Sequence, residues 1–142
     1  MAVAIETLRG EHRRLRREVD AMREAARELP ELSPVERAEL RDWIVSFLNE
    51  VLIPFAEAEE QGLYAGVAEL LGDERSIAPM IYDHRAICER AVELASTPVT
   101  DVARLQELMY GLHALIEVHF RKEEELYLPL AELAWMTGPS RT

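Results

Sequence analysis

Apolar residues recur every three or four positions along four successive segments of the chain, which is the period of an amphipathic α-helix. The four stripes contain Ile5, Leu8, Leu15, Val19 and Met22; Leu40, Ile44, Phe47, Val51, Phe55 and Leu63; Ile77, Met80, Ile87, Ala91 and Leu94; and Leu105, Leu112, Ile116, Leu126 and Leu130. We predict helices over about residues 3–28, 34–71, 77–96 and 101–136. Because no segment alternates as a half-buried β-strand does, the sequence predicts an all-α fold.

Helix start and stop signals separate these segments. Ser33 precedes a proline and lies three residues before Glu36, which is the pattern of a capping box. Gly72 marks a helix stop, and Thr100 or Asp101 can cap the last helix. Pro54 is expected to kink the long second helix. Short joints make successive helices antiparallel neighbours, so we predict an up-down-up-down four-helix bundle that forms a single domain over residues 1–142.

Composition and charge narrow the classes of partner. The chain has 142 residues and a net charge of -11. Such a charge would be repelled by nucleic acid and by an anionic membrane, and no apolar run approaches the roughly 18 residues of a membrane span. The one cysteine, Cys88, cannot form an intrachain disulfide, so we expect a cytoplasmic protein. A homodimer is compatible with this composition.

Five polar residues occupy positions where a stripe requires an apolar side chain. They are His12, Glu59, His84, His119 and Glu123. Burying a neutral polar group without a partner costs about 2–7 kcal/mol, and burying a charge costs more. His119 and Glu123 are four residues apart, hence about 40° apart around one helix and directed at one centre. A cation that all five contact is the simplest compensation, and imidazole with carboxylate suits iron, manganese or zinc.

An alternative interpretation treats these five residues as core or boundary residues whose hydrogen bonds are made with one another or with water. A lone histidine in a stripe is more often such a residue than a ligand, but three of the four histidines lie on stripes, which favours a metal. His113 is interpreted as a boundary residue and Cys88 as a small buried hydrophobe. Tyr127 is either a hydrogen-bond donor to the centre or a packing residue. Most other nearby acidic residues are expected to be solvated: Glu57, Glu60, Glu124 and Glu125.

The interrupting residues resemble the bacterial hemerythrin-like family, also called the HHE cation-binding domain. That pattern has a histidine in helix 1, His-x-x-x-Glu in helix 2, a histidine in helix 3 and His-x-x-x-Glu in helix 4. His12, His84 and the run His119-Phe-Arg-Lys-Glu123 match it, and Glu59 matches the helix-2 glutamate. The resemblance implies a non-haem di-iron centre that binds dioxygen or reacts with peroxide or nitric oxide, with Glu59 and Glu123 bridging the irons.

Phe55 departs from the pattern, because it stands where the family has the helix-2 histidine. By the resemblance, the metal near His12 loses a nitrogen ligand while the metal of His84 and His119 keeps both. Tyr64 is expected to lie too far along the helix, by about 13 Å, to replace it. We favour an asymmetric di-iron site, with two irons per chain, whose open positions favour reaction over carriage. A single metal held by His84, His119 and glutamate, or a bundle without metal, are the alternatives.

Three functional classes remain open at this stage. The leading one is an iron protein that binds or consumes dioxygen, peroxide or nitric oxide, with no common catalytic motif to identify an enzyme. The second is an interaction module that senses iron or oxygen without turnover. The third is a structural helical bundle. Peroxide-consumption and oxygen-binding assays on iron-loaded protein separate them.

Overall fold

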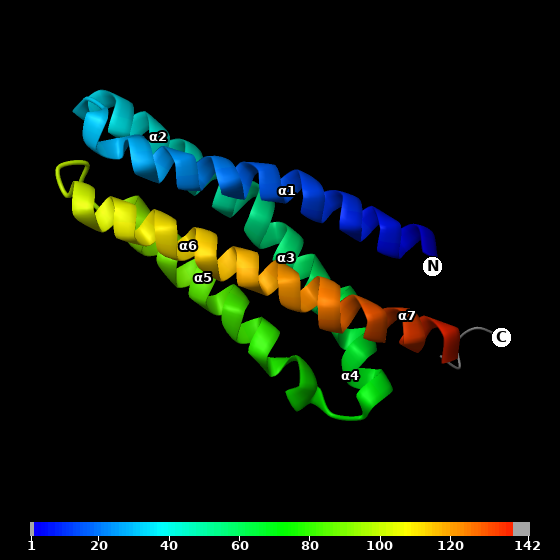
Figure 1. Ribbon diagram of the computed structural model, residues 1–142. Helices are drawn as coiled ribbons and strands as arrows, with labels where there is room; N and C mark the ends of the chain where they lie inside the picture. The colour runs from blue at the N-terminus through cyan, green and yellow to red at the C-terminus, as the bar shows by residue number, and fades with distance from the viewer. Residues whose placement is uncertain (1, 138–142) are drawn as a thin grey trace.

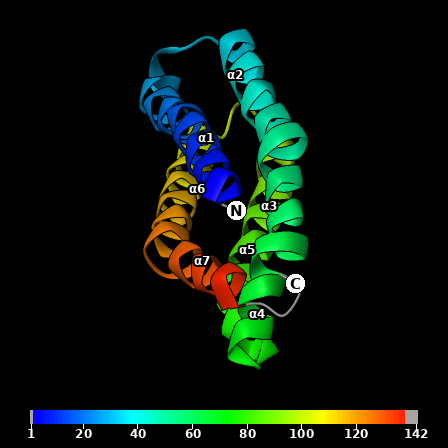
Figure 2. The same ribbon diagram turned by 90° about the vertical axis from the view of Figure 1, so that its right-hand side faces the viewer.

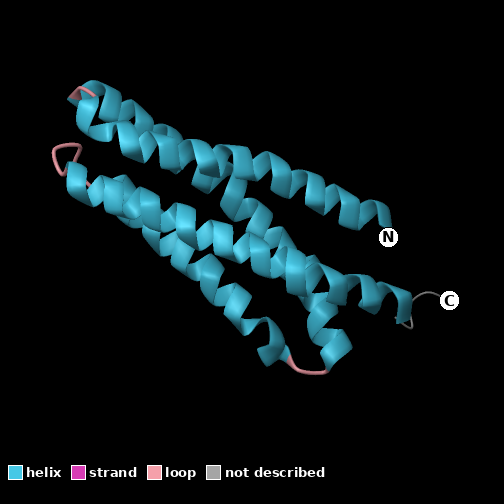
Figure 3. Cartoon of the chain, viewed as in Figure 1, coloured by secondary structure: helices cyan, strands magenta, loops and turns pink. Residues whose placement is uncertain are grey.

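The computed structural model describes residues 2–137 of the chain and the side chains of residues 5–137. Seven α-helices are found there: α1 Ala2–Glu28, α2 Pro34–Phe47, α3 Ile53–Glu59, α4 Ala65–Leu71, α5 Ala78–Ser96, α6 Val102–Lys122 and α7 Leu128–Thr137. Figures 1 and 3 show that they form four long rods with no strand among the described residues. The fold is an all-α four-helix bundle, as predicted.

The second and fourth rods are built from several helices joined through π-helical turns. The turns η2 Leu48–Leu52 and η3 Glu60–Tyr64 join α2, α3 and α4, and η5 Glu123–Tyr127 joins α6 to α7. Pro54 is the second residue of α3, directly after η2, so the backbone is irregular near the proline. A π-turn holds one more residue than an α-helical turn, which rotates all later side chains around the helix.

Two predicted core positions are wrong for this reason. Val51 is 47% exposed because it lies within η2, and Leu48 and Leu52 face the core in its place. Leu126 is 56% exposed because it lies within η5, and Tyr127 is buried instead. A strict α-helical period therefore predicts the wrong buried residues at these two π-turns. In the first rod, which has no π-turn, the predicted stripe faces the core from Ile5 onward.

Capping residues define the ends of the rods much as the sequence indicates. Ser33 accepts a hydrogen bond from the backbone N–H of Glu36, whose side chain accepts one from the backbone N–H of Ser33, which completes the capping box. Gly72 ends α4 with a φ of 69°, in the left-handed region that favours glycine. Asp101, rather than Thr100, caps α6 by accepting from the backbone N–H of Arg104.

The rods pack so that α1 lies along α6 and α5 lies along α6, while α4 packs against α7 (Figures 1 and 2). The core consists of two apolar clusters. The larger includes Leu15, Leu52 and Ile116, and the smaller includes Ile5 and Leu128. His12, Glu59, His84 and Glu123 each lie between residues of the two clusters along their rods, and His119 lies at the end of the larger cluster, just before Phe120. No helix among residues 2–137 is long and apolar enough to cross a membrane.

Candidate metal centre

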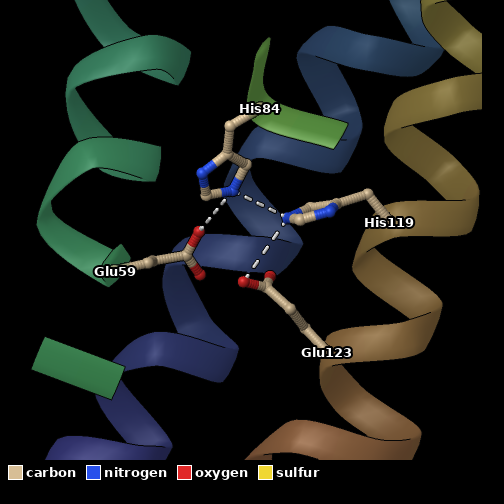
Figure 4. Close-up of side chains that lie close together, drawn as sticks. All are labelled: Glu59, His84, His119 and Glu123. Carbon is tan, nitrogen blue, oxygen red and sulfur yellow. Dashed lines mark hydrogen bonds and ion pairs between the residues drawn. The ribbon is translucent and has the colours of Figure 1, made fainter. Parts of the chain in front are cut away.

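The five polar residues predicted from the stripes lie together in the interior. Their exposed fractions range from 0% for His12 and Glu123 to 6% for His84. All four rods contribute: α1 carries His12, α3 ends in Glu59, α5 carries His84, α6 carries His119, and η5 begins with Glu123. Figure 4 shows four of them directed toward one another between the helices, and their ligand atoms lie within 4.8 Å of one another.

His84 and His119 face each other with their Nε2 atoms 3.0 Å apart. On the outer side of each ring, the Nδ1 atom of His84 lies 3.0 Å from Oε1 of Glu60, and that of His119 lies 2.9 Å from Oδ2 of Asp83. Each Nδ1–H can therefore donate to a carboxylate, which leaves Nε2 of a neutral ring as an acceptor. Burial, together with the charge of His119, lowers the pKa of His84 and favours its neutral form. Two acceptor nitrogens this close repel each other unless a proton or a metal cation lies between them.

The two buried glutamates each direct one oxygen to either side of the cluster. Oε1 of Glu59 lies 3.8 Å from Nε2 of His84, and its Oε2 lies 3.4 Å from Nε2 of His12. Oε1 of Glu123 lies 3.5 Å from Nε2 of His119, and its Oε2 lies 2.9 Å from Nε2 of His12. Carboxylates arranged in this way can contact two cations at once, one beside the histidine pair and one beside His12.

His12 repeats the arrangement of the other two imidazoles. Its Nδ1 atom lies 3.3 Å from Oε1 of Glu124, and its Nε2 atom faces the two buried glutamates. Phe120 stacks on the ring with 4.6 Å between centroids, and Phe55 meets it edge-on at 5.7 Å. The ring of His12 is therefore bordered by two apolar rings, Phe55 of α3 and Phe120 of α6.

Without a metal, protons hold the cluster together. Burial alone would lower the pKa of His12, but hydrogen bonds with Glu123 and Glu59 raise it to about 10. Burial raises the pKa of Glu59 to about 9, against the opposing effect of His12 and with the help of Glu123. Burial opposes ionisation of Glu123, but its neighbours His119 and His12 hold its pKa below the ordinary value. Even so, Oε2 of Glu123 has no hydrogen bond of acceptable geometry. A buried carboxylate oxygen that faces imidazole nitrogens without a well-formed hydrogen bond fits a cation site.

The sequence matches one family description, the hemerythrin HHE cation binding domain, over residues 3–131. That range covers most of the 142 residues. The chain belongs to the hemerythrin HHE cation-binding family. No curated protein and no solved structure matches it. The family resemblance noted in the sequence is therefore confirmed, and the buried cluster is where this hemerythrin-like bundle can hold a cation.

Phe55 borders the His12 side of the centre, because its ring contacts the ring of His12. A cavity of about 10 Å³ lies beside Phe55 and is also bounded by Glu59, His84 and His119. A space of that size holds about one water-sized molecule. A larger pocket of about 250 Å³ opens between α3 and α5, on the far side of His84.

Tyr64 is a further polar side chain of the centre that the sequence did not indicate. It is fully buried, and its hydroxyl lies 3.3 Å from Nε2 of His84 and 3.2 Å from Nε2 of His119, and donates to Oε1 of Glu123. Tyr64 is the last residue of the turn η3, which rotates it into the centre. It lies on the side of His84 and His119, so nothing contradicts the expectation that it cannot replace a ligand at Phe55, on the His12 side.

Three carboxylates that support the imidazoles also differ from the prediction. Glu60 and Glu124 were expected to be solvated, but they contact the Nδ1 atoms of His84 and His12. Asp83 was not singled out, although it directly precedes His84 in the sequence. It contacts His119 and, at 2.6 Å, Nζ of Lys122. Metal-bound histidines commonly donate to carboxylates in this way. Each of these carboxylates lies on a different rod from its histidine, so local sequence spacing gives no signal for the pairs.

The remaining residues in question lie outside the centre. Tyr127 donates to the backbone oxygen of Ser76 at 2.7 Å, so it does not donate to the cluster. His113 lies 3.1 Å from Oδ1 of Asp20 near the surface, in agreement with its interpretation as a boundary residue. Cys88 is only partly buried and lines the pocket between α3 and α5 that His84 also borders.

Proposed function

We propose that this protein is a hemerythrin-like protein with an asymmetric di-iron centre. One iron is assigned to His84 and His119, the other to His12, and Glu59 and Glu123 bridge them. The observation that carries the proposal is the orientation of the imidazoles. All three direct Nε2 inward while a carboxylate contacts Nδ1, which is the arrangement of metal-bound histidines.

Iron bound there supplies sites for dioxygen or nitric oxide, or for reaction with peroxide. The chain itself makes the two sides of the centre unequal. Phe55 and Phe120 cover His12 with apolar rings, and neither can bind a metal, so the His12 side has fewer protein ligands. Fewer protein ligands leave more positions for a small molecule, which favours reaction over reversible carriage.

Iron content is the first test. Purified protein is loaded with ferrous iron without oxygen, freed of loosely held metal, and analysed for iron, manganese and zinc. We expect about two irons per chain, as in di-iron carboxylate proteins. His84→Ala is expected to lose iron, whereas the matched control His113→Ala removes a histidine from the same bundle and should keep it. Equal iron in the two variants would contradict the assignment.

Assays on the loaded protein then separate the functional classes. Consumption of peroxide or nitric oxide over many turnovers supports an enzyme, and reversible binding of dioxygen supports a carrier. A structural change on iron binding, with no turnover and no ligand binding, supports the sensing module instead.

A single-metal centre is the second candidate, because one observation favours it. The ligand atoms of Glu59, His84, His119 and Glu123 form a compact group that does not include His12. Hydrogen bonds with Glu123 and Glu59, working against burial, raise the pKa of His12 to about 10, so its imidazolium can occupy the place of the second cation. His12→Ala distinguishes the two candidates. Iron content falls from two to one per chain in the di-iron case, and stays at one in the single-metal case.

A further inference from the structure

The hydroxyl oxygen of Tyr64 is about as close to the Nε2 atoms of His84 and His119 as these two atoms are to each other. Its hydroxyl is 3.3 Å from Nε2 of His84 and 3.2 Å from Nε2 of His119, which are themselves 3.0 Å apart. The ring is 0% exposed. The three atoms therefore form a compact triangle of one oxygen and two nitrogens inside the protein.

Hydrogen bonding does not account for this triangle. A phenol has one proton to donate, and Tyr64 donates it to Oε1 of Glu123. When both rings direct their Nδ1–H groups at carboxylates, both Nε2 atoms are acceptors, and the proton of Tyr64, which goes to Glu123, is not available to either of them. The hydroxyl oxygen of Tyr64 therefore lies close to the lone pairs of two Nε2 atoms, and its single proton is already donated elsewhere.

The backbone places Tyr64 in this position by an irregular turn. η3 covers Glu60–Tyr64 and directly follows Glu59, which belongs to the centre. π-turns inside α-helices are uncommon and are frequently found at functional sites. The ring of Tyr127 packs against that of Tyr64 with 5.9 Å between centroids, and the ring of His84 stacks on it at 5.5 Å. These contacts fix the ring, and the hydroxyl is directed at the centre.

We propose that Tyr64 is a metal ligand: its phenolate oxygen binds the same iron as His84 and His119. This inference rests on the proposed function, because it adds a ligand to that centre. On coordination, the proton that Tyr64 donates to Glu123 leaves the site for solvent, as protons do when metals bind ionisable ligands. The histidine pair then gains an anionic oxygen ligand, whereas the His12 side has an apolar ring in place of an imidazole.

A phenolate ligand biases the chemistry of that iron. It is a hard, anionic oxygen donor, and such donors stabilise the ferric ion more than the ferrous ion. Tyrosine holds iron in this way in haem catalases. The iron at His84 and His119 is therefore expected to rest in the ferric state. This agrees with a protein that reacts with an oxidant and disagrees with one that carries dioxygen reversibly.

Spectroscopy of ferric protein tests the assignment without reference to activity. Protein loaded with ferrous iron is oxidised in air, and its optical and resonance Raman spectra are recorded. Phenolate bound to ferric iron gives a visible charge-transfer band and enhanced tyrosine ring vibrations. We expect both in the wild type and in Tyr127→Phe, the control from the neighbouring ring. Tyr64→Phe is expected to lose both and to have a more positive midpoint potential.

Labelling keeps the test valid if Tyr64→Phe binds too little iron to measure. Wild-type protein grown with ring-deuterated tyrosine should show the enhanced vibrations shifted, which attributes them to tyrosine. Ferric protein with full iron content but no phenolate vibrations overturns this proposal and leaves the proposed function intact. Vibrations that persist in Tyr64→Phe and vanish in Tyr127→Phe also overturn it. Protein that retains no iron overturns the proposed function and this inference together.

Discussion

Oε2 of Glu123 lies 2.9 Å from Nε2 of His12 and has no hydrogen bond of acceptable geometry, although both residues are 0% exposed. A buried carboxylate oxygen without a good partner is costly in a folded protein. In the metal-free protein the His12 imidazolium faces this oxygen, and a metal cation bound between the two atoms would take the place of its proton.

Glu123→Gln tests the bridging role of this carboxylate. The amide keeps one oxygen but replaces the other by an NH₂ group that cannot bind a metal. We expect iron content to fall from two per chain to one or none. Glu125→Gln, an exposed residue of the same turn η5, is the matched control and should leave the iron content unchanged. Equal iron content in the two variants would show that Glu123 does not bridge metals.

Phe55→His tests whether the missing imidazole weakens the His12 side. The ring of Phe55 lies edge-on to His12, so a histidine there can direct a nitrogen at the same metal. We expect tighter retention of the second iron during chelation and a changed optical spectrum. Val51→His places the same side chain on the exposed face one turn earlier and should change neither property. An unaltered spectrum and iron content in Phe55→His would refute the missing-ligand argument.

Asp83→Asn tests the carboxylates that contact the Nδ1 atoms. Asp83 lies 2.9 Å from Nδ1 of His119, where it orients the ring and increases its basicity as a ligand. Loss of such a partner typically lowers metal affinity by about 10–100-fold. Asp42→Asn, an exposed aspartate of α2, serves as the control. Competition with a coloured chelator measures the affinity, and equal affinities for the two variants would rule out this role of Asp83.

The pH dependence of stability should differ between metal-free and iron-loaded protein. In the metal-free state the pKa of Glu59 is raised to about 9 and that of His12 to about 10. Between the ordinary and the raised values the native state binds more protons than the unfolded state, so stability falls as pH rises. We expect the melting temperature of metal-free protein to drop from about pH 7 to about pH 10.

Iron should remove much of this dependence, because bound metal takes the place of the protons at Glu59 and His12. Glu59→Gln removes one of the two titrating groups and should flatten the curve of the metal-free protein. Thermal melts followed by circular dichroism measure both effects. A melting temperature of metal-free protein that is constant or rising over this range would contradict the protonated cluster.

The fold and much of the donor set could be predicted from the sequence because helical periodicity is a local property. His12, His84 and His119 were each recognisable as polar residues in an apolar stripe, and the structure brings them together. Prediction failed where the period itself changes. The π-turns η2 and η5 move Val51 and Leu126 to the surface, and η3 moves Tyr64 into the centre. Whether a π-turn forms depends on how the rods pack against one another, and the apolar stripe of a single helix contains no information on that packing.

Carboxylates such as Glu60 and Glu124 were missed for a different reason. They lie half-exposed at the edge of the core, where an acidic residue is normally solvated. Only the position of an imidazole on a neighbouring rod gives each of them a partner, and that position is a tertiary property.

Crystals of protein loaded with iron give the most direct measurement, by anomalous diffraction at the iron absorption edge. The account predicts two peaks inside the bundle, one beside His84 and His119 and one beside His12, with Glu59 and Glu123 contacting both. No peak in this interior, with the same side chains paired only to one another, would contradict it.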